Sequence, residues 1–190
     1  MPKQIGRPHL IGIDDGPFDK GQASPAPLVA VLMEGPDLVE GVATRWFPID
    51  GDGATELIAN WITGLRARPA LDGIVLGGIT VAGLGVIDVN ALSGALALPV
   101  LVVNRRDPAE HTLDGALRAA GLVERIATVA ATPPSLRVDE HLFLACAGAP
   151  WERGRDLVLA SRSKSALPEP LRVAHLVAAA IARGESRGRA

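Results

Sequence analysis

The chain has 190 residues, a formal net charge of −2 and 48% apolar residues, so we expect one domain over residues 1–190 with a full hydrophobic core. The single cysteine, Cys146, excludes an internal disulfide and a cysteine-based zinc cluster. No secretory signal opens the chain and no apolar run is long enough to cross a membrane, which favours a cytoplasmic protein without a membrane partner.

The first candidate site lies at the end of an apolar run. Residues 9–13 are followed by Asp14 and Asp15 and stopped by Gly16-Pro17, which predicts a short buried strand. Because side chains alternate along a strand, the two carboxylates are expected to point to opposite faces. An inward carboxylate is costly unless it is paired, protonated or bound to a metal. The pair therefore either shapes a turn or belongs to a functional site.

Two more strands and a helix are predicted next. Residues 28–33 and 39–49 read as strands around the turn residues 35–37, which favours an antiparallel meander. Apolar residues then recur at helical spacing from Asp52, the expected N-cap, to Pro69. Glu56 lies in the second turn of this predicted helix.

From residue 72 onward, strands and helices alternate. The predicted order is strand 74–76, a glycine-rich loop 77–85, helix 88–96, strand 98–103 and helix 109–120. The loop lacks the Gly-Lys-Ser/Thr of a phosphate-binding P-loop, but its glycines allow a partner to approach the backbone closely. Right-handed crossovers would place these strands parallel to the first, giving the mixed sheet of a ribonuclease H-like α/β fold. Ligands usually bind at the edge where such strands end.

The C-terminal third gives a weaker pattern. Residues 123–130 and 142–146 fit either a helix or a strand, and residues 151–159 are predicted to be helical. Residues 171–183 are predicted to form a last helix, whose inward side chains are Val173, Leu176, Val177 and Ile181. The low net charge excludes a bulk polyanion binder, although local arginine patches can still hold phosphates.

Five segments together resemble the archaeal-type homologues of endonuclease V, also called conserved domain of unknown function number ninety-nine or endonuclease dU. In chain order they are GIDDGPF, VEGVATRWFPIDGDGATELI, DGIVLGGITVAGLGVIDV, PVLVVNRRDP and PEPLRVAHLVAAAIARGESRGRA. The resemblance implies a ribonuclease H-like nuclease that cuts DNA or RNA near deaminated bases. It also implies a divalent metal, Mg²⁺ or Mn²⁺, held by carboxylates.

The resemblance gives individual residues a role. Asp14 matches the metal-binding aspartate of the first strand, Glu56 matches the glutamate of the following helix, and Asp15 is a further candidate ligand. Arg105 takes the place of a basic residue near the scissile phosphate, so the expected catalytic residues are Asp14, Glu56 and Arg105. Glu169 and His175 are alternatives for the last polar residue of the site. The expected nucleic-acid contacts are Gly78, Thr80, Gly83, Arg105, Arg106 and Arg187.

One departure from the family pattern leaves the function open. The nuclease has a second metal-binding aspartate where this chain has Gly77, and Asp88 would reach that place only by folding back. The chain is therefore either a metal-dependent endonuclease that acts on deaminated DNA, or a catalytically reduced protein that binds nucleic acid or a partner on the same scaffold. A different nucleotide or small-molecule hydrolase is the third reading. The sequence predicts no oligomeric state.

Overall fold

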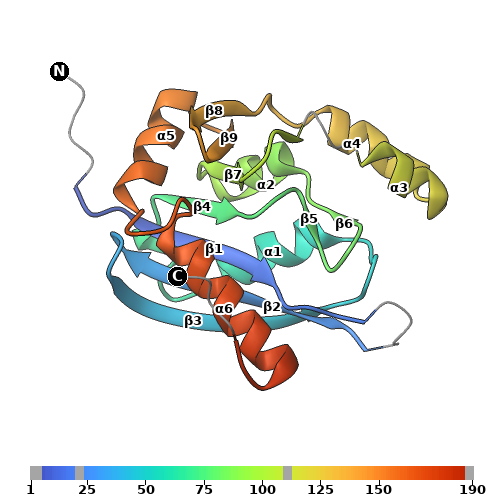
Figure 1. Cartoon of the computed structure of the whole chain (residues 1–190), viewed down its shortest axis with the longest axis horizontal. Helices are drawn as coiled ribbons and strands as arrows, with labels where there is room; N and C mark the ends of the chain where they lie inside the picture. Colours follow the sequence, from blue (N-terminus) through green and yellow to red (C-terminus); the bar gives the residue numbers. More distant parts are fainter. Residues whose placement is uncertain (1–5, 20–23, 109–112, 187–190) are drawn as a thin grey trace.

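The computed structural model describes residues 6–19, 24–108 and 113–186. Seven strands form one mixed sheet in the order β3-β2-β1-β4-β7-β9-β8 (Figure 1). Their bounds are β1 His9–Asp15, β2 Ala26–Glu34, β3 Leu38–Phe47, β4 Gly73–Leu76, β7 Val100–Asn104, β8 Leu136–Asp139 and β9 Leu142–Ala147. A separate hairpin consists of β5 Thr80–Val81 and β6 Gly85–Val86. The α-helices are α1 Ala54–Thr63, α2 Val89–Leu96, α3 Asp114–Ala119, α4 Ile126–Ala130, α5 Trp151–Ala160 and α6 Glu169–Arg183.

The strand directions bring three strand ends to one edge of the sheet. β1, β2 and β3 form the predicted antiparallel meander, and β4 and β7 run parallel to β1. The carboxyl ends of β1, β4 and β7 therefore meet at the same edge, as expected. The ambiguous segment 142–146 is a strand, β9, which runs antiparallel to β7. The ambiguous segment 123–130 is helical, with a 3₁₀ turn at Val123–Arg125 before α4.

Helices cover both faces of the sheet. Apolar side chains of α1 and α2 pack against Ile11 and Ile13 of β1 on one face. On the other face, Leu10 of β1 packs with residues of α5 and with Leu171 of α6. Neighbouring β1 residues thus enter different cores, as the alternation of side chains along a strand requires. No helix among the described residues has both the length and the apolarity needed to cross a membrane.

The boundaries of several elements differ from the sequence-based expectation. α1 begins after Gly53, whose φ of 78° lies in the left-handed region that favours glycine, and Gly64 ends it before Pro69 is reached. Asp52 is therefore not the N-cap; its carboxylate pairs with Arg125 instead. The third strand stops at Phe47, and α3 covers only the end of the predicted helix 109–120, of which residues 109–112 lie outside the described residues.

The buried face of α6 also differs from the expectation. Its most buried apolar residues include Leu171, Ala174 and Ala178, whereas Ile181 is 41% exposed. The reason lies in β1, where a Cβ on Gly12 would overlap the backbone of Pro170 and Leu171. The helix lies so close to the strand that only small side chains fit between them. The large apolar residues therefore flank the contact, and the alanines fill it.

Candidate metal and nucleic-acid site

The Asp14 carboxylate is paired with a histidine of the last helix. Asp14 lies near the carboxyl end of β1, and its Oδ2 is 2.8 Å from Nδ1 of His175 on α6. An ionised carboxylate only accepts hydrogen bonds, so Nδ1 of His175 donates. This hydrogen bond raises the pKa of His175, although partial burial and the nearby Arg105 oppose the rise. The close packing of α6 on Gly12 and Gly16 brings the two side chains together.

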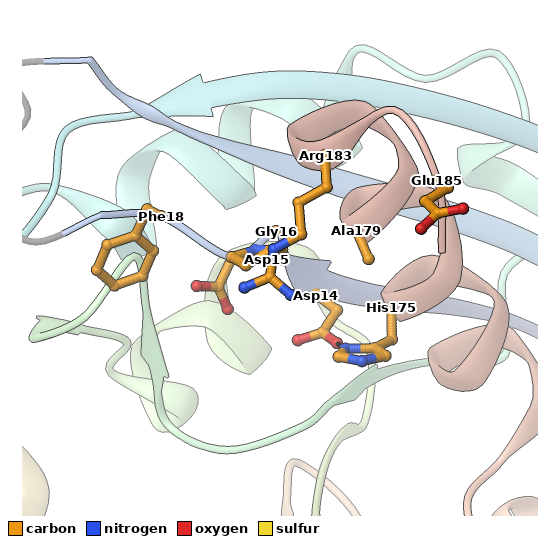
Figure 2. Close-up of a pocket in the computed structure, with 9 residues that line it drawn as sticks. Asp14, Asp15, Gly16, Phe18, His175, Ala179, Arg183 and Glu185 are labelled. Atoms are coloured by element: carbon orange, nitrogen blue, oxygen red, sulfur yellow. Dashed lines mark hydrogen bonds and ion pairs between the residues drawn. The ribbon is translucent and has the colours of Figure 1, made fainter. Parts of the chain in front are cut away.

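The neighbouring carboxylate, Asp15, points to the other face of the sheet. Its Oδ2 accepts a hydrogen bond of 3.0 Å from the Ala82 N–H, in the turn of the β5–β6 hairpin. Burial, followed by the charge of Asp14, raises the pKa of Asp15 to about 6. Figure 2 shows Asp14 directed to His175 and Asp15 on the side of Phe18. The predicted divergence of the two carboxylates is what the structure shows.

Two other strand ends lie beside Asp14. Gly77 directly follows β4, and a Cβ placed on it would lie 3.7 Å from Asp14 Oδ1. Asn104 is the last residue of β7, and the exposed Arg105 follows it. A cavity of about 380 Å³ is lined by residues of all three strand ends and by His175. The edge that was expected to hold the ligand is thus assembled around Asp14.

Two larger cavities flank this centre. One, of about 540 Å³, is lined by Asp14, Asp15 and Phe18 on one side and by His175, Arg183 and Glu185 on the other (Figure 2). The other, of about 790 Å³, begins at Gly77, Asn104 and Arg105 and extends to the segment 129–135. Asp14 and His175 therefore lie between these two cavities, and arginine side chains line both of them.

The glycine-rich loop is held by its neighbours more firmly than the sequence suggests. Asp50 Oδ1 accepts a hydrogen bond of 2.8 Å from the Leu84 N–H, and the buried Arg125 donates to the Leu84 carbonyl at 2.6 Å. Gly83 has a φ of 91° and faces Asp50. It is not among the residues that line the three cavities. Gly78 and Thr80, in contrast, line the largest cavity together with Arg105 and Arg106.

Other predicted site residues lie apart from Asp14. Glu56 is exposed on α1 and lines none of the three cavities. Asp88 caps α2 by accepting from the Ala91 N–H at 2.9 Å. Glu169 is 5% exposed and pairs with Arg172 in the first turn of α6. The structure thus places His175, not Glu169, at the centre, while Arg187 lies outside the described residues.

The expected three-carboxylate metal site is not assembled. Among the described residues, the only group of three metal-ligating side chains with ligand atoms within 4.8 Å of one another is His9, Glu34 and Glu40. This group lies at the start of β1, at the opposite end of the strand from Asp14, and Arg7 already donates to Glu34. Glu56 therefore does not join Asp14 and Asp15 in this structure.

Comparison with known protein families shows which family this chain belongs to. The sequence pattern of the family described as Endonuclease dU matches residues 7–182. The chain belongs to the Endonuclease dU family. A relative of this Endonuclease dU chain, the UPF0215 protein of Methanothermobacter thermautotrophicus, is 35% identical over 186 residues, which cover 96% of this chain and 91% of the relative. The resemblance seen in the five sequence segments is confirmed.

Solved structures show the fold of the Endonuclease dU chain. A protein of unknown function from Archaeoglobus fulgidus matches it with a TM-score of 0.85 and 31% identity, over 92% of this chain and 98% of that one. Endonuclease V of Ciona intestinalis, solved with an inosine-containing DNA, matches with a TM-score of 0.56 and 13% identity, over 88% and 82% of the two chains. The fold is ribonuclease H-like, as predicted.

Sequence reasoning about this Endonuclease dU chain missed several residues of the site. Asn104, Arg183 and Glu185 were not proposed as site residues, although each lines a cavity next to Asp14. A signal for Asn104 was available, because the last polar residue of a parallel strand lies at the ligand edge. No signal placed Arg183, since its position depends on how α6 crosses β1.

Proposed function

We propose that this chain is a divalent-metal-dependent endonuclease that hydrolyses phosphodiester bonds in DNA near deaminated bases, with deoxyuridine as the first candidate. The observation that carries the proposal is the Asp14–His175 pair beside Asp15, set between two hollows at the ligand edge of a ribonuclease H-like sheet. The family to which the chain belongs supports a nuclease and, by its name, deoxyuridine.

The residues around Asp14 fit a hard divalent cation. Mg²⁺ prefers oxygen ligands and is usually held by one or two carboxylates with several waters. Asp14 supplies such oxygens, whereas Asp15 lines the same cavity from the other face of the sheet, and burial is the main cause of its raised pKa. Space is available as well, because Gly77 offers no side chain next to Asp14 Oδ1. Mg²⁺ or Mn²⁺ held by Asp14, with waters as its other ligands, would polarise the phosphodiester and acidify a bound water.

In this proposal the basic side chains of the site have different roles. Arg105 follows β7 at the exposed rim of the site, where it can neutralise charge that develops on the phosphate. Arg183 lines the hollow on the other side of Asp14 and can hold a neighbouring phosphate of the strand. His175 donates to Asp14 and so fixes the orientation of this carboxylate.

The largest cavity can receive the base. Enzymes that act at a base commonly take it out of the stack, and a deaminated base is easier to extrude because its pairing is weakened. A volume of about 790 Å³ is ample for a single base. Gly78 and Thr80 line it, and Arg105 and Arg106 stand at its wall, next to the proposed position of the phosphate.

Gly77 favours a second candidate function. Two-metal hydrolysis needs carboxylates that hold both ions close together, and glycine contributes none at this strand end. A protein that binds damaged nucleic acid without cutting it would keep the arginines and the cavities. We rank this function second, because the pairing of Asp14 with His175 has no evident purpose in binding alone.

A nicking assay on duplex DNA with one deoxyuridine or one inosine tests the proposal. With Mg²⁺ or Mn²⁺ we expect a nick near the modified base, and Asp14→Asn should reduce the rate by about two orders of magnitude or more. The control Glu152→Gln changes an exposed carboxylate on α5 that lines none of the three cavities. Binding without nicking by the wild type, with both variants folded, would establish the second function instead.

A further inference from the structure

The strand β3 forms a long free edge of the sheet. It has 10 residues, Leu38–Phe47, and no other strand of the described chain pairs with its outer side (Figure 1). Such an edge presents a row of backbone donors and acceptors that can pair with another strand. Edges are usually protected by charged side chains, proline, a β-bulge or a covering element; β3 has no lysine or proline, and its protection is limited to Glu40, Arg45 and a bulge.

One face of β3 is apolar and uncovered. Helix α6 packs on β1 and β2 but not extensively on β3. Val39, Val42 and Trp46 are 46%, 52% and 56% exposed. Val39 and Val42 share this face because the register with β2 shifts between Leu32 and Met33, which leaves Glu40 as an extra residue of a β-bulge. The bulge thus gathers three large apolar side chains on one side of the free edge.

We propose that β3 pairs with β3 of a second copy of this chain, antiparallel and about a two-fold axis at Ala43. With the bulge counted as one position, Arg45 of each copy lies opposite the Glu40-Gly41 bulge of the other. Trp46 then lies opposite Val39, and Thr44 lies opposite Val42. The two-fold axis produces each of these pairs twice, and the two sheets become one.

Charge complementarity supports a second copy as the occupant. Glu40 and Arg45 point to the same face of the sheet, where Glu40 approaches His9 and Arg45 lies over the Trp61 ring. Their positions on either side of Ala43 put opposite charges together and keep like charges apart. A β-branched residue opposite an aromatic one is also a favourable cross-strand pair. A strand of an unrelated protein is not expected to carry opposite charges at the positions that face Glu40 and Arg45.

Charge-swap variants of the full chain test the dimer by sedimentation equilibrium. We expect the wild type to move from monomer to dimer with rising concentration. Glu40→Arg and Arg45→Glu should each weaken the dimer by about tenfold or more, because two like-charged pairs arise by symmetry. The double variant restores both pairs and should recover the dimer. Glu140→Arg, at an exposed residue outside β3, is the matched control.

A second substitution keeps the test informative if the swaps disturb the contacts with His9 or Trp61. Val42 is exposed, and Val42→Lys should give a folded monomer, as judged by thermal melting. A wild type that stays monomeric at every accessible concentration overturns the proposal. A dimer that survives the single swaps and Val42→Lys also overturns it, because the interface would then lie elsewhere.

Discussion

The Asp15 carboxylate destabilises the metal-free fold at neutral pH. Its pKa is about 6 in the folded chain, against an ordinary value of 3.8, so the folded state binds the proton more tightly than the unfolded state. The free energy of unfolding therefore falls as the pH rises between these two values, and the full penalty is present above the folded pKa. We expect Asp15→Asn to stabilise the metal-free protein at neutral pH by about 1–2 kcal/mol.

Urea unfolding in the presence of a chelator, over a pH series that spans the pKa of about 6, measures this effect. The gain from Asp15→Asn should shrink as the pH falls, because the wild-type carboxyl is then protonated as well. A gain that is independent of pH would contradict the electrostatic origin of the effect. Asp72→Asn is a suitable comparison, since Asp72 accepts from the His9 N–H at the other end of β1.

Gly77 is the position where one substitution should strengthen the proposed metal site. A Cβ here would meet Leu171 and Asp14 Oδ1 at 3.6–3.7 Å, which is ordinary contact, so Gly77→Asp should fold. We expect it to lower the Mg²⁺ concentration for half-maximal nicking by about tenfold, because the ion gains a carboxylate. The rise in melting temperature on adding Mg²⁺ should grow too. Gly94→Asp, on the exposed side of α2, should change neither quantity.

Residue patterns identified part of the site and no more. Asp14 and Asp15 stood out because two carboxylates ended an apolar strand, and their divergence followed from strand alternation. The choice between Glu169 and His175 was open, because it depends on the angle and height at which α6 crosses β1. Glu56 was expected beside Asp14, yet its helix ends up packed on α2. Such distances depend on packing between elements, which a local pattern does not contain.

At the scale of the elements, the contact between α6 and β1 should be the most sensitive to added volume. A Cβ on Gly12 meets the backbone of α6, which cannot move aside as a flexible side chain would. We expect Gly12→Ala to destabilise the fold by about 3 kcal/mol and to reduce nicking as α6 is displaced. Gly94→Ala adds the same methyl group inside α2, where nothing lies within 4 Å, and should be neutral or stabilising.

Urea midpoints of the two glycine variants provide the comparison. Equal midpoints would show that α6 is free to shift, and the close packing of helix and strand would then be wrong. The same packing explains why the hydrophobic pattern of α6 misled the prediction for Ile181. A pattern of large apolar residues identifies the buried stripe only where the helix rests on side chains. Helix α6 rests on the backbone of β1, so alanines form its buried face.

At the scale of the whole molecule, the order of the elements was enough to predict the sheet. Three strands with short turns, followed by alternating helices and strands, leave few arrangements once crossovers are right-handed. The β8–β9 hairpin was not predicted as such, because residues 142–146 are a short apolar run without a clear period. The sequence also could not predict that β3 is an edge strand, because the residue pattern of a strand does not show whether another strand pairs with its outer side.

The pairing of Asp14 with His175 joins positions that are 161 residues apart. A ribosome releases β1 early, and the last helix leaves only after all the strands. A growing chain therefore carries Asp14 for most of its synthesis without the histidine that holds it. The proposed catalytic centre forms only when α6 packs on Gly12 and Gly16, so we expect a chain that lacks α6 not to cut nucleic acid.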